Sequence, residues 1–263
     1  MGNREQAERL REEPDGGDHY RPIASAFRAD PRRSGDVALN ALVDMASEDD
    51  VWVDVGAGAG RFALPLALHV RRVIAVEPSP AMRAELAQLQ TEHGIFNVDI
   101  CDERWPTDDP ALNEIADVAL ISHVGYDIEP IAEFLDTLDR SARRECVALT
   151  FDRAPGSLFW QAWPMVHDEE HVQLPGGEDL VALLRARGAV VDVSPIAGST
   201  RVRWSFDSFD EALQWGRRRL WLAEDSAKLP RLREAIHAIL VEEDGRWTLP
   251  ERPTQQLIRW RTR

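Results

Sequence analysis

The sequence has almost no lysine and very little cysteine. Among 263 residues there is one lysine, Lys228, so 30 of the 31 basic residues are arginine. The two cysteines, Cys101 and Cys146, are too few for a disulfide framework, and neither belongs to a Cys-x-x-Cys or zinc-binding pattern. We therefore expect buried free thiols, as in a reducing cytoplasm, and no metal site.

Long apolar runs are also missing. No run approaches the ~18–20 residues that span a bilayer. The first residues, MGNREQAERLREEP, are charged and lack the apolar region of a secretory signal. We expect a cytoplasmic protein that does not enter a membrane.

Positive charge is scarce relative to negative charge. The 31 basic and 46 acidic residues give a net charge of −15. A chain this acidic repels nucleic acid and anionic membranes unless a local basic patch intervenes. The short arginine run at 217–219 lies near acidic residues and is typical of a solvated helix face. We therefore expect no nucleic-acid partner.

The apolar residues follow an alternation of strands and helices. Short apolar runs, as expected of strands buried on both faces, occur at 51–55, 72–77, 96–100, 116–122 and 144–151. Helical patterns lie between them at 61–70, 79–90 and near 129–142, after an earlier one at 34–46. This rhythm predicts an α/β fold with a mostly parallel, doubly wound sheet that has helices on both faces.

The rest of the chain elaborates this domain. We expect an N-terminal arm and helix over 1–48 and one main domain over 49–263. Within it, 154–177 is aromatic and irregular. A helix at 178–187 and a strand at 189–194 resume the α/β pattern, an alternating strand follows at 201–206, and extra helices follow at 208–222 and 229–243.

The chemistry-bearing motif is Asp54-Val55-Gly56-Ala57-Gly58-Ala59-Gly60-Arg61, which follows the first strand and opens a helix. Glycines there permit a tight turn and a close approach of a ligand. The spacing departs from the dinucleotide motif, because Arg61 stands where the third glycine would be. Asp54 would repel a pyrophosphate but suits a ligand that carries an ammonium group.

Two more carboxylates follow the next strands. Glu77 ends the second strand, where it can accept both hydroxyls of a ribose. Asp102, after the third strand, can accept a hydrogen bond from an adenine amino group, and Trp105 can cover the ring. All of these lie at the carboxyl ends of strands, where open α/β sheets bind ligands.

With these motifs in order, residues 45–195 resemble the class I S-adenosylmethionine-dependent methyltransferases. The resemblance implies a Rossmann-like seven-stranded sheet whose last strand is antiparallel, supplied by 201–206 or by 256–260. It implies S-adenosylmethionine as cofactor, with Asp54 on the methionine moiety, Glu77 on the ribose and Asp102 on the adenine. The implied cofactor site comprises Asp54, Gly56, Ala57, Gly58, Glu77, Pro78, Asp102, Glu103, Trp105, Ser122 and His123.

The loop after the fourth strand, Ser122-His123-Val124-Gly125-Tyr126-Asp127, would face the transferred methyl group. It lacks the Asn/Asp-Pro-Pro-Tyr arrangement of family members that methylate exocyclic amines of nucleic-acid bases or side-chain amides of proteins. His123 is a candidate general base, since its ordinary pKa suits proton removal near neutrality. Its alternative role is to pack on the cofactor or cap the loop. Tyr126 is a candidate for orienting the acceptor.

The flanking segments carry open alternatives. Residues 154–177 form either a substrate lid lined by Phe159, Trp160 and Trp163, or a core of the same aromatics. Residues 1–48 either fold over the cofactor or pack on the sheet. The helices over 208–243 either cover a pocket or form the face of a homodimer.

We therefore expect a methyltransferase that acts on a small-molecule acceptor by in-line displacement. Two alternatives remain: a non-catalytic protein that binds S-adenosylmethionine or S-adenosylhomocysteine, and a protein methyltransferase. A nicotinamide-dependent oxidoreductase is disfavoured by Asp54 and by the glycine spacing.

Overall fold

The computed structural model describes residues 2–13, 18, 20–21, 23–157, 159–196, 205–250 and 253–262. The chain divides into two compact units. One, which we call the sheet unit, comprises Gly16–Thr150, Gly177–Ser199 and Gln255–Arg263. The other, which we call the helical unit, comprises Met1–Asp15, Phe151–Gly176 and Thr200–Thr254. These boundaries differ from the predicted division at residue 48, because the first 15 residues group with two later segments.

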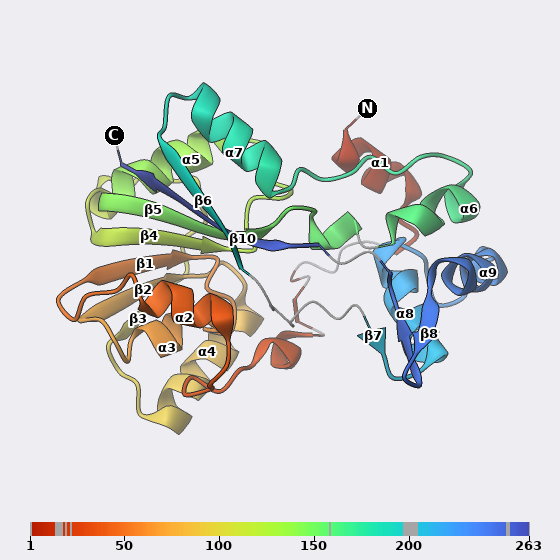
Figure 1. Ribbon diagram of the computed structural model, residues 1–263, viewed down its shortest axis with the longest axis horizontal. Helices are drawn as coiled ribbons and strands as arrows, with labels where there is room; N and C mark the ends of the chain where they lie inside the picture. Colours follow the sequence, from red (N-terminus) through yellow and green to blue (C-terminus); the bar gives the residue numbers. More distant parts are fainter. Residues whose placement is uncertain are drawn as a thin grey trace. The chain divides into compact units, whose positions relative to one another are not determined.

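A seven-stranded sheet forms the centre of the sheet unit (Figure 1). Its strand order is β3-β2-β1-β4-β5-β10-β6. The strands are β1 (Val51–Val55), β2 (Arg72–Val76), β3 (Val98–Cys101), β4 (Ala116–Ser122), β5 (Ala142–Phe151), β6 (Val191–Ile196) and β10 (Gln255–Arg261). The strands from β3 to β5 pair in parallel, whereas β10 and β6 are antiparallel to each other. The predicted seven-stranded Rossmann-like sheet is confirmed.

The antiparallel strand comes from the second of the two predicted ranges. Residues 255–261 form β10, which lies between β5 and β6. Of the other range, 201–204 lie outside the described residues, and Ser205–Phe206 form β7 of a separate small sheet.

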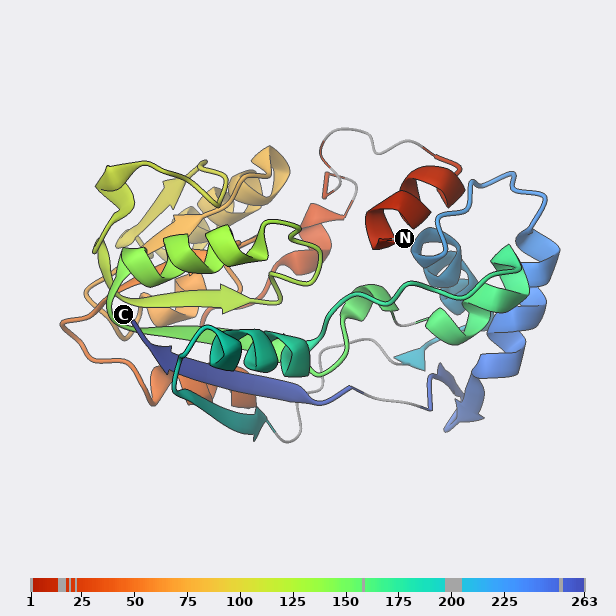
Figure 2. The ribbon, with the colours of Figure 1, turned by 90° about the horizontal axis from the view of Figure 1, so that it is seen from above.

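Helices cover both faces of the seven-stranded sheet (Figure 1), and Figure 2 shows one of these helical layers from above, over the strands. The helices are α2 (Val37–Val43), α3 (Ala63–Leu66), α4 (Pro80–His93), α5 (Ile131–Ser141) and α7 (Gly177–Ala186). Trp52 packs with α2, α3 and α4, whereas Val51, Val53 and Val55 pack with α5 and α7. This alternation follows from the two-residue period of a strand, and it confirms the doubly wound arrangement.

Local signals set the ends of these helices. The Asp36 carboxylate accepts the Leu39 N–H at the start of α2, and the Ser79 hydroxyl accepts the Met82 N–H at the start of α4. The predicted helix over 61–70 shrinks to α3. Pro65 has no N–H to donate to the carbonyl of Arg61, so the helix begins only at Ala63.

The helical unit has its own core. Its helices are α1 (Asn3–Leu10), α6 (Trp163–His167), α8 (Phe209–Arg219) and α9 (Leu229–Ile239). Phe159, Trp163 and Phe206 are each 1% exposed and pack with Leu220 and Ile236. Phe159 and Trp163 are therefore core residues of this unit. A lid role for 154–177 stays a prediction.

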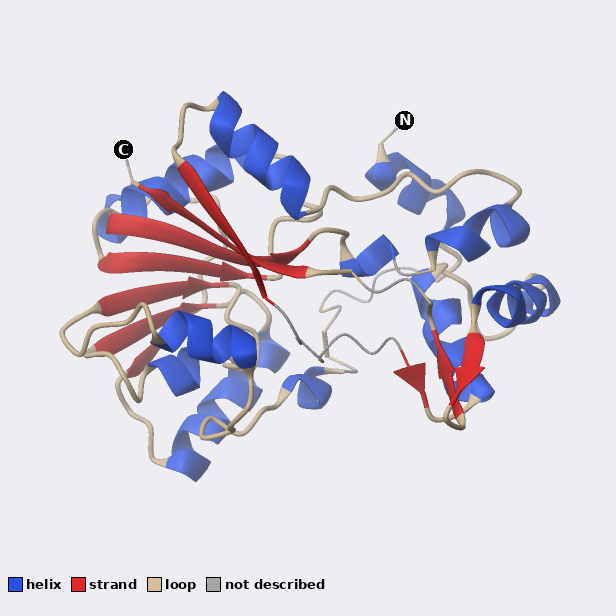
Figure 3. Ribbon diagram, viewed as in Figure 1, coloured by secondary structure: helices blue, strands red, loops and turns tan. Residues whose placement is uncertain are grey.

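A three-stranded sheet completes the helical unit, in the order β7-β9-β8 (Figure 3). The last residues of the helix predicted over 229–243 instead form β8 (Val241–Glu243), which pairs with β9 (Arg246–Thr248). The prediction was wrong there because Asp244-Gly245 makes a two-residue hairpin turn, with φ of 51° and 75°. That dipeptide was a readable turn signal.

The close packing of α8 on α9 leads to a stability prediction. A Cβ on Gly216 would lie 2.6 Å from Cδ1 of Ile236, a side chain that is fully buried. We expect Gly216→Ala to lower the free energy of unfolding by about 1–2 kcal/mol, since overpacking outweighs the gain in helix propensity. Ile236→Val removes the colliding methyl group. In urea unfolding, the double variant should lose less than the sum of the two single losses.

No helix among the described residues is long and apolar enough to cross a membrane.

Candidate active site

The glycine motif forms a turn directly after β1. The backbone N–H groups of Gly56 and Ala57 both donate to the carbonyl oxygen of Val76, at 2.8 and 3.1 Å. Gly56 has a φ of 80°, and a Cβ there would lie 2.4 Å from Cγ2 of Val124. Gly58 has a φ of 57°, and no atom lies within 4 Å of where its Cβ would be. The loop after β4 therefore packs on Gly56, while open space lies over Gly58.

Asp54 is a buried carboxylate with an unused oxygen. The side chain lies at the end of β1 and is 1% exposed. Its Oδ1 atom has no hydrogen-bond partner among the described residues. Burial, and then the negative charge of Glu77, raise its pKa to about 7, although the Ala63 N–H opposes this by donating to the carboxylate. An uncompensated buried carboxylate is unfavourable, so this site favours a cationic ligand group.

Glu77 lies next to the same loop, just after β2. Its Oε2 accepts the Gly58 N–H and its Oε1 accepts the Ser79 N–H, both at 2.8 Å. Burial raises its pKa, and the two backbone N–H groups oppose that rise. Each carboxylate oxygen can accept two hydrogen bonds and here accepts one from the backbone. The fixed side chain can therefore accept further hydrogen bonds from ligand hydroxyls.

The N-terminal segment contacts this region. The Asp18 carboxylate accepts the Ser79 hydroxyl at 2.8 Å and the Ala81 N–H at 3.1 Å, at the start of α4. Ala24 packs with Ala59 of the glycine motif and with Met82. Asp18 thus lies against the start of α4, and Ala24 lies against the glycine motif. Whether the segment also covers a cofactor stays a prediction.

The residues predicted after β3 lie in two environments. Asp102 and Glu103 are exposed, as is Pro78 after β2. Trp105 is instead 8% exposed and packs edge-on against Phe134, with ring centroids 6.4 Å apart. In this geometry its ring belongs to the core on one face of the sheet. A cover over an adenine ring stays a prediction for this residue.

The loop after β4 begins with His123, a partly buried side chain at a φ of 57°. Its Nδ1 lies 3.3 Å from the Tyr126 hydroxyl, and its Nε2 lies 3.1 Å from the amide nitrogen of Gln255. The Thr150 hydroxyl donates to the Tyr126 hydroxyl at 2.8 Å. Burial, and then the positive charge of Arg61, lower the His123 pKa to about 4. The imidazole is therefore neutral at physiological pH.

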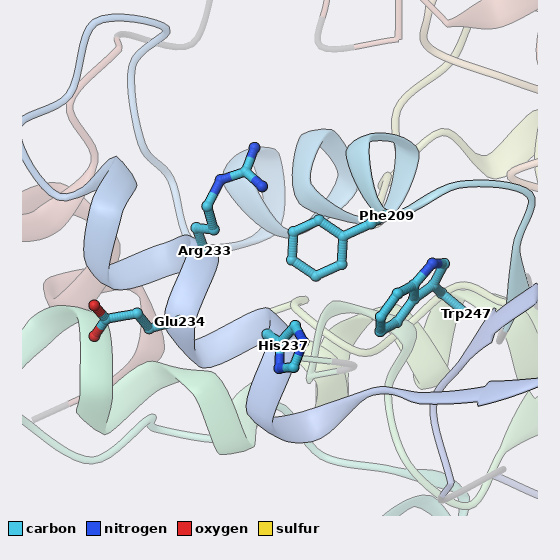
Figure 4. Close-up of a pocket in the computed structure, with 5 residues that line it drawn as sticks. All are labelled: Phe209, Arg233, Glu234, His237 and Trp247. Carbon is cyan, nitrogen blue, oxygen red and sulfur yellow. The ribbon is translucent and has the colours of Figure 1, made fainter.

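The helical unit has a shallow aromatic pocket on its surface, lined by Phe209, Arg233, Glu234, His237 and Trp247 (Figure 4). The rings of Phe209 and Trp247 meet edge to face, with centroids 5.0 Å apart, and His237 lies within 6 Å of both. Arg233 already covers the Phe209 ring, at 5.3 Å from its centroid. Such a surface suits a flat apolar group.

His167 and His171, four residues apart, both pack against the buried Trp163 ring, with centroids 4.5 and 4.4 Å from it. The His167 Nε2 lies 2.9 Å from the Leu220 carbonyl, and its Nδ1 lies 3.3 Å from the Lys228 amine. Within the described ranges, no three His, Cys, Asp or Glu side chains are grouped to hold a metal ion.

The comparison with protein families decides the assignment. A family described as a methyltransferase domain matches residues 28–193, more than half of the chain. The chain belongs to this methyltransferase domain family. No curated protein sequence matches the methyltransferase.

Solved structures show the same fold as this methyltransferase. A putative methyltransferase from Bacillus halodurans has a TM-score of 0.59 at 15% identity, over 86% of this chain and 98% of that one. Coclaurine N-methyltransferase, bound to N-methylheliamine and SAH, has a TM-score of 0.55 at 11% identity, over 98% of this chain and 86% of that one. The cyclase SpnF has a TM-score of 0.55 at 18% identity, over 90% of this chain and 85% of that one. At these identities the likeness concerns the fold.

The predicted site residues of the methyltransferase fall into one connected group, three exposed residues (Pro78, Asp102 and Glu103) and the buried Trp105. Asp54, Gly56, Ala57, Gly58, Glu77, Ser122, His123 and Tyr126 lie at the ends of β1, β2 and β4 or on the loops that follow them. These loops contact one another through the Val76 carbonyl, Glu77 and Val124. The sequence analysis missed Asp18, Val124, Thr150 and Gln255. Val124 lies within the quoted loop, but its contact with Gly56 is tertiary, and the other three belong to no local motif.

Proposed function

We propose that this methyltransferase binds S-adenosylmethionine and transfers its methyl group to a small-molecule acceptor by in-line displacement. The observation that carries the proposal is the buried Asp54 carboxylate, whose Oδ1 has no partner among the described residues. Bound in the site, S-adenosylmethionine would supply a methyl group on a positively charged sulfur. The presence of SAH in the similar fold of coclaurine N-methyltransferase supports this cofactor.

The residues present fit that cofactor. Asp54 would accept hydrogen bonds from the ammonium group, an interaction that is strong for a charged pair away from water. Glu77, fixed by two backbone N–H groups, would accept the ribose hydroxyls. The open space over Gly58 leaves room for the ligand. Asp102, exposed just after β3, would accept the adenine amine.

The acceptor side favours a small molecule over nucleic acid. The loop at Ser122–Asp127 has no Asn/Asp-Pro-Pro-Tyr arrangement, and the net charge of −15 repels polyanions. His123 and Tyr126 lie beside Val124, the residue that packs on Gly56, so both are near the glycine motif. Holding an acceptor nucleophile in line with the methyl group accounts for much of the rate in such a reaction.

Calorimetric titration of the full chain tests the cofactor. We expect S-adenosylmethionine and SAH to bind, and NADH not to bind. Glu77→Gln should weaken binding about tenfold or more, since it removes a charged acceptor of two ribose hydroxyls. Glu48→Gln is the matched control, because Glu48 is exposed and precedes β1, at the opposite end of that strand from Asp54. Binding of NADH alone would contradict the proposal.

The acceptor class needs a second measurement. Methyl-labelled S-adenosylmethionine would be incubated with the protein and either a small-molecule fraction or a set of basic peptides. We expect label in the small molecules. Label in peptides would make the protein a protein methyltransferase. Tight cofactor binding without transfer to either fraction would leave a non-catalytic binding protein, and would contradict the proposal.

A further inference from the structure

Four side chains in the sheet unit form a continuous hydrogen-bonded row, and the proposed function assigns no role to the row as a whole. Gln255 begins β10, His123 and Tyr126 lie in the loop after β4, and Thr150 is near the end of β5. The three distances along the row, from Gln255 to His123, to Tyr126 and to Thr150, are 3.1, 3.3 and 2.8 Å.

The direction of each bond in the row follows from the atoms involved. The amide nitrogen of Gln255 can only donate, so the His123 Nε2 that faces it must be the acceptor. The ring proton of a neutral His123 is then on Nδ1, which donates to the Tyr126 oxygen. The Thr150 hydroxyl donates to the same oxygen. Two donors from two different elements therefore converge on the hydroxyl of Tyr126.

The backbone at His123 shows that this geometry is imposed by its surroundings. A φ of 57° is unfavourable for a residue that has a Cβ, by roughly 1 kcal/mol. The His123 N–H donates to the Leu149 carbonyl at 2.8 Å, which holds the loop against β5. Gln255 is 3% exposed and lies in a paired strand, opposite Ile196 of β6. The ring of His123 is thus held between two fixed partners.

The charge around His123 agrees with a neutral ring. Burial disfavours protonation of the imidazole, and the positive charge of Arg61, after the glycine motif, adds to this effect. Tyr126 is the titratable group bonded to the ring, whereas Gln255 and Thr150 carry no charge. A protonated imidazole would present an N–H to the Gln255 amide nitrogen, which is a donor itself. With the amide nitrogen of Gln255 toward Nε2, only the neutral ring fits this partner.

We propose that Gln255 is a positioning residue of the methyltransfer site: it holds His123 in the neutral form protonated on Nδ1, so that His123 and Thr150 together orient the hydroxyl of Tyr126. This inference rests on the proposed function, since the loop of His123 and Tyr126 packs on Gly56 through Val124. In this arrangement His123 acts through Tyr126 and takes no proton from the acceptor.

Histidine nitrogen NMR on the full chain, without ligand, reads the protonated nitrogen directly. The chain has seven histidines, and the signals of His123 are those that His123→Asn removes. We expect Nδ1 to carry the proton throughout the neutral pH range. Gln255→Glu replaces the donor by an acceptor, so the proton should move to Nε2 or the ring should titrate at a higher pH. Gln256→Glu, on the opposite face of β10, should change neither.

The two tyrosines of the chain give a second reading. With labelled tyrosine, Tyr20 and Tyr126 give two signals, and Tyr20 is an exposed internal reference. Gln255→Leu and Thr150→Val should each shift the Tyr126 signal and leave that of Tyr20 in place. A purely structural role would leave the ring proton and the Tyr126 signal unchanged in folded variants.

Three results would overturn the inference: a proton on Nε2 in the unaltered protein, a Gln255→Glu variant in which neither the ring proton nor the pH of ring titration changes, or an unmoved Tyr126 signal in Thr150→Val. Gln255→Glu conserves size, so the test does not depend on Gln255→Leu folding. Calorimetry with S-adenosylmethionine on the same samples separates this inference from the proposed function. If the unaltered protein does not bind S-adenosylmethionine, the proposed function is contradicted. The NMR readings are made without ligand, so they test the inference about Gln255 independently.

Discussion

Replacing Asp54 by Asn is expected to weaken the binding of S-adenosylmethionine by about 100-fold or more. The ammonium group of the ligand would lose its charged partner in a site that is 1% exposed. Removing one member of a buried charge pair typically costs about 3–5 kcal/mol, and about 1.4 kcal/mol is a factor of ten in affinity. The amide keeps the shape of the side chain, so the loss would be electrostatic.

The same substitution is expected to stabilise the protein without ligand. The Asp54 pKa is raised from its usual 3.8 to about 7, mainly by burial. The folded protein therefore holds this proton between about pH 4 and pH 7, where the unfolded chain has released it. Stability should accordingly fall as the pH rises through this window, and the asparagine variant should not show this part of the fall. Above pH 7 the difference amounts to a few kcal/mol, on the order of 4.

Two measurements on one sample check this prediction. Urea unfolding at pH 5 and pH 8 should show a gain in stability for Asp54→Asn that is larger at pH 8. Calorimetry at pH 8 should show the loss of binding. For the unaltered protein, binding of S-adenosylmethionine should tighten between pH 6 and pH 8, because a larger fraction of Asp54 is ionised at the higher pH. Equal affinities of Asp54→Asn and the unaltered protein would rule out Asp54 as the ammonium site.

Much of the sheet unit could be predicted because its signals are local. The apolar runs at 51–55 and 116–122 coincide with β1 and β4, since a strand buried on both faces reads as a continuous apolar segment. Ser79 and Pro80 predicted the start of α4, because serine favours the N-cap position and proline the first position of a helix. The glycine motif and the carboxylates after it are also local, and the structure brings the glycine motif and Glu77 into contact.

Other features depend on contacts between distant residues, which no local pattern contains. Gln255 lies 132 positions from His123, and nothing in the polar start of β10 indicates that its amide meets an imidazole. The aromatics Phe159 and Trp163 were compatible with a lid or with a core. Only the packing of α8 and α9 against them distinguishes the two environments. The positive φ of His123 likewise arises from tertiary constraints on its loop.

Gly58→Ala should abolish most cofactor binding while leaving the fold intact. The loss would come from the methyl group in the open space over Gly58 and would exceed any effect of the backbone conformation alone. Its φ of 57° makes an alanine unfavourable by about 1–2 kcal/mol, yet no atom lies within 4 Å of the added methyl group. Gly94, which ends α4 at a φ of 65°, has equally open surroundings. Gly94→Ala is therefore a control with the same backbone penalty.

In urea unfolding, the two alanine variants should lose similar stability. In calorimetry with S-adenosylmethionine only Gly58→Ala should lose affinity, by about 10- to 100-fold, since a methyl group forced into a filled site costs about 1–3 kcal/mol. The reason is that the space over Gly58 lies beside the Glu77 carboxylate, which accepts the Gly58 N–H. If both variants bound equally well, the open space over Gly58 would not be the path of the cofactor, and the ligand would have to be held by Asp54 and Glu77 from another side.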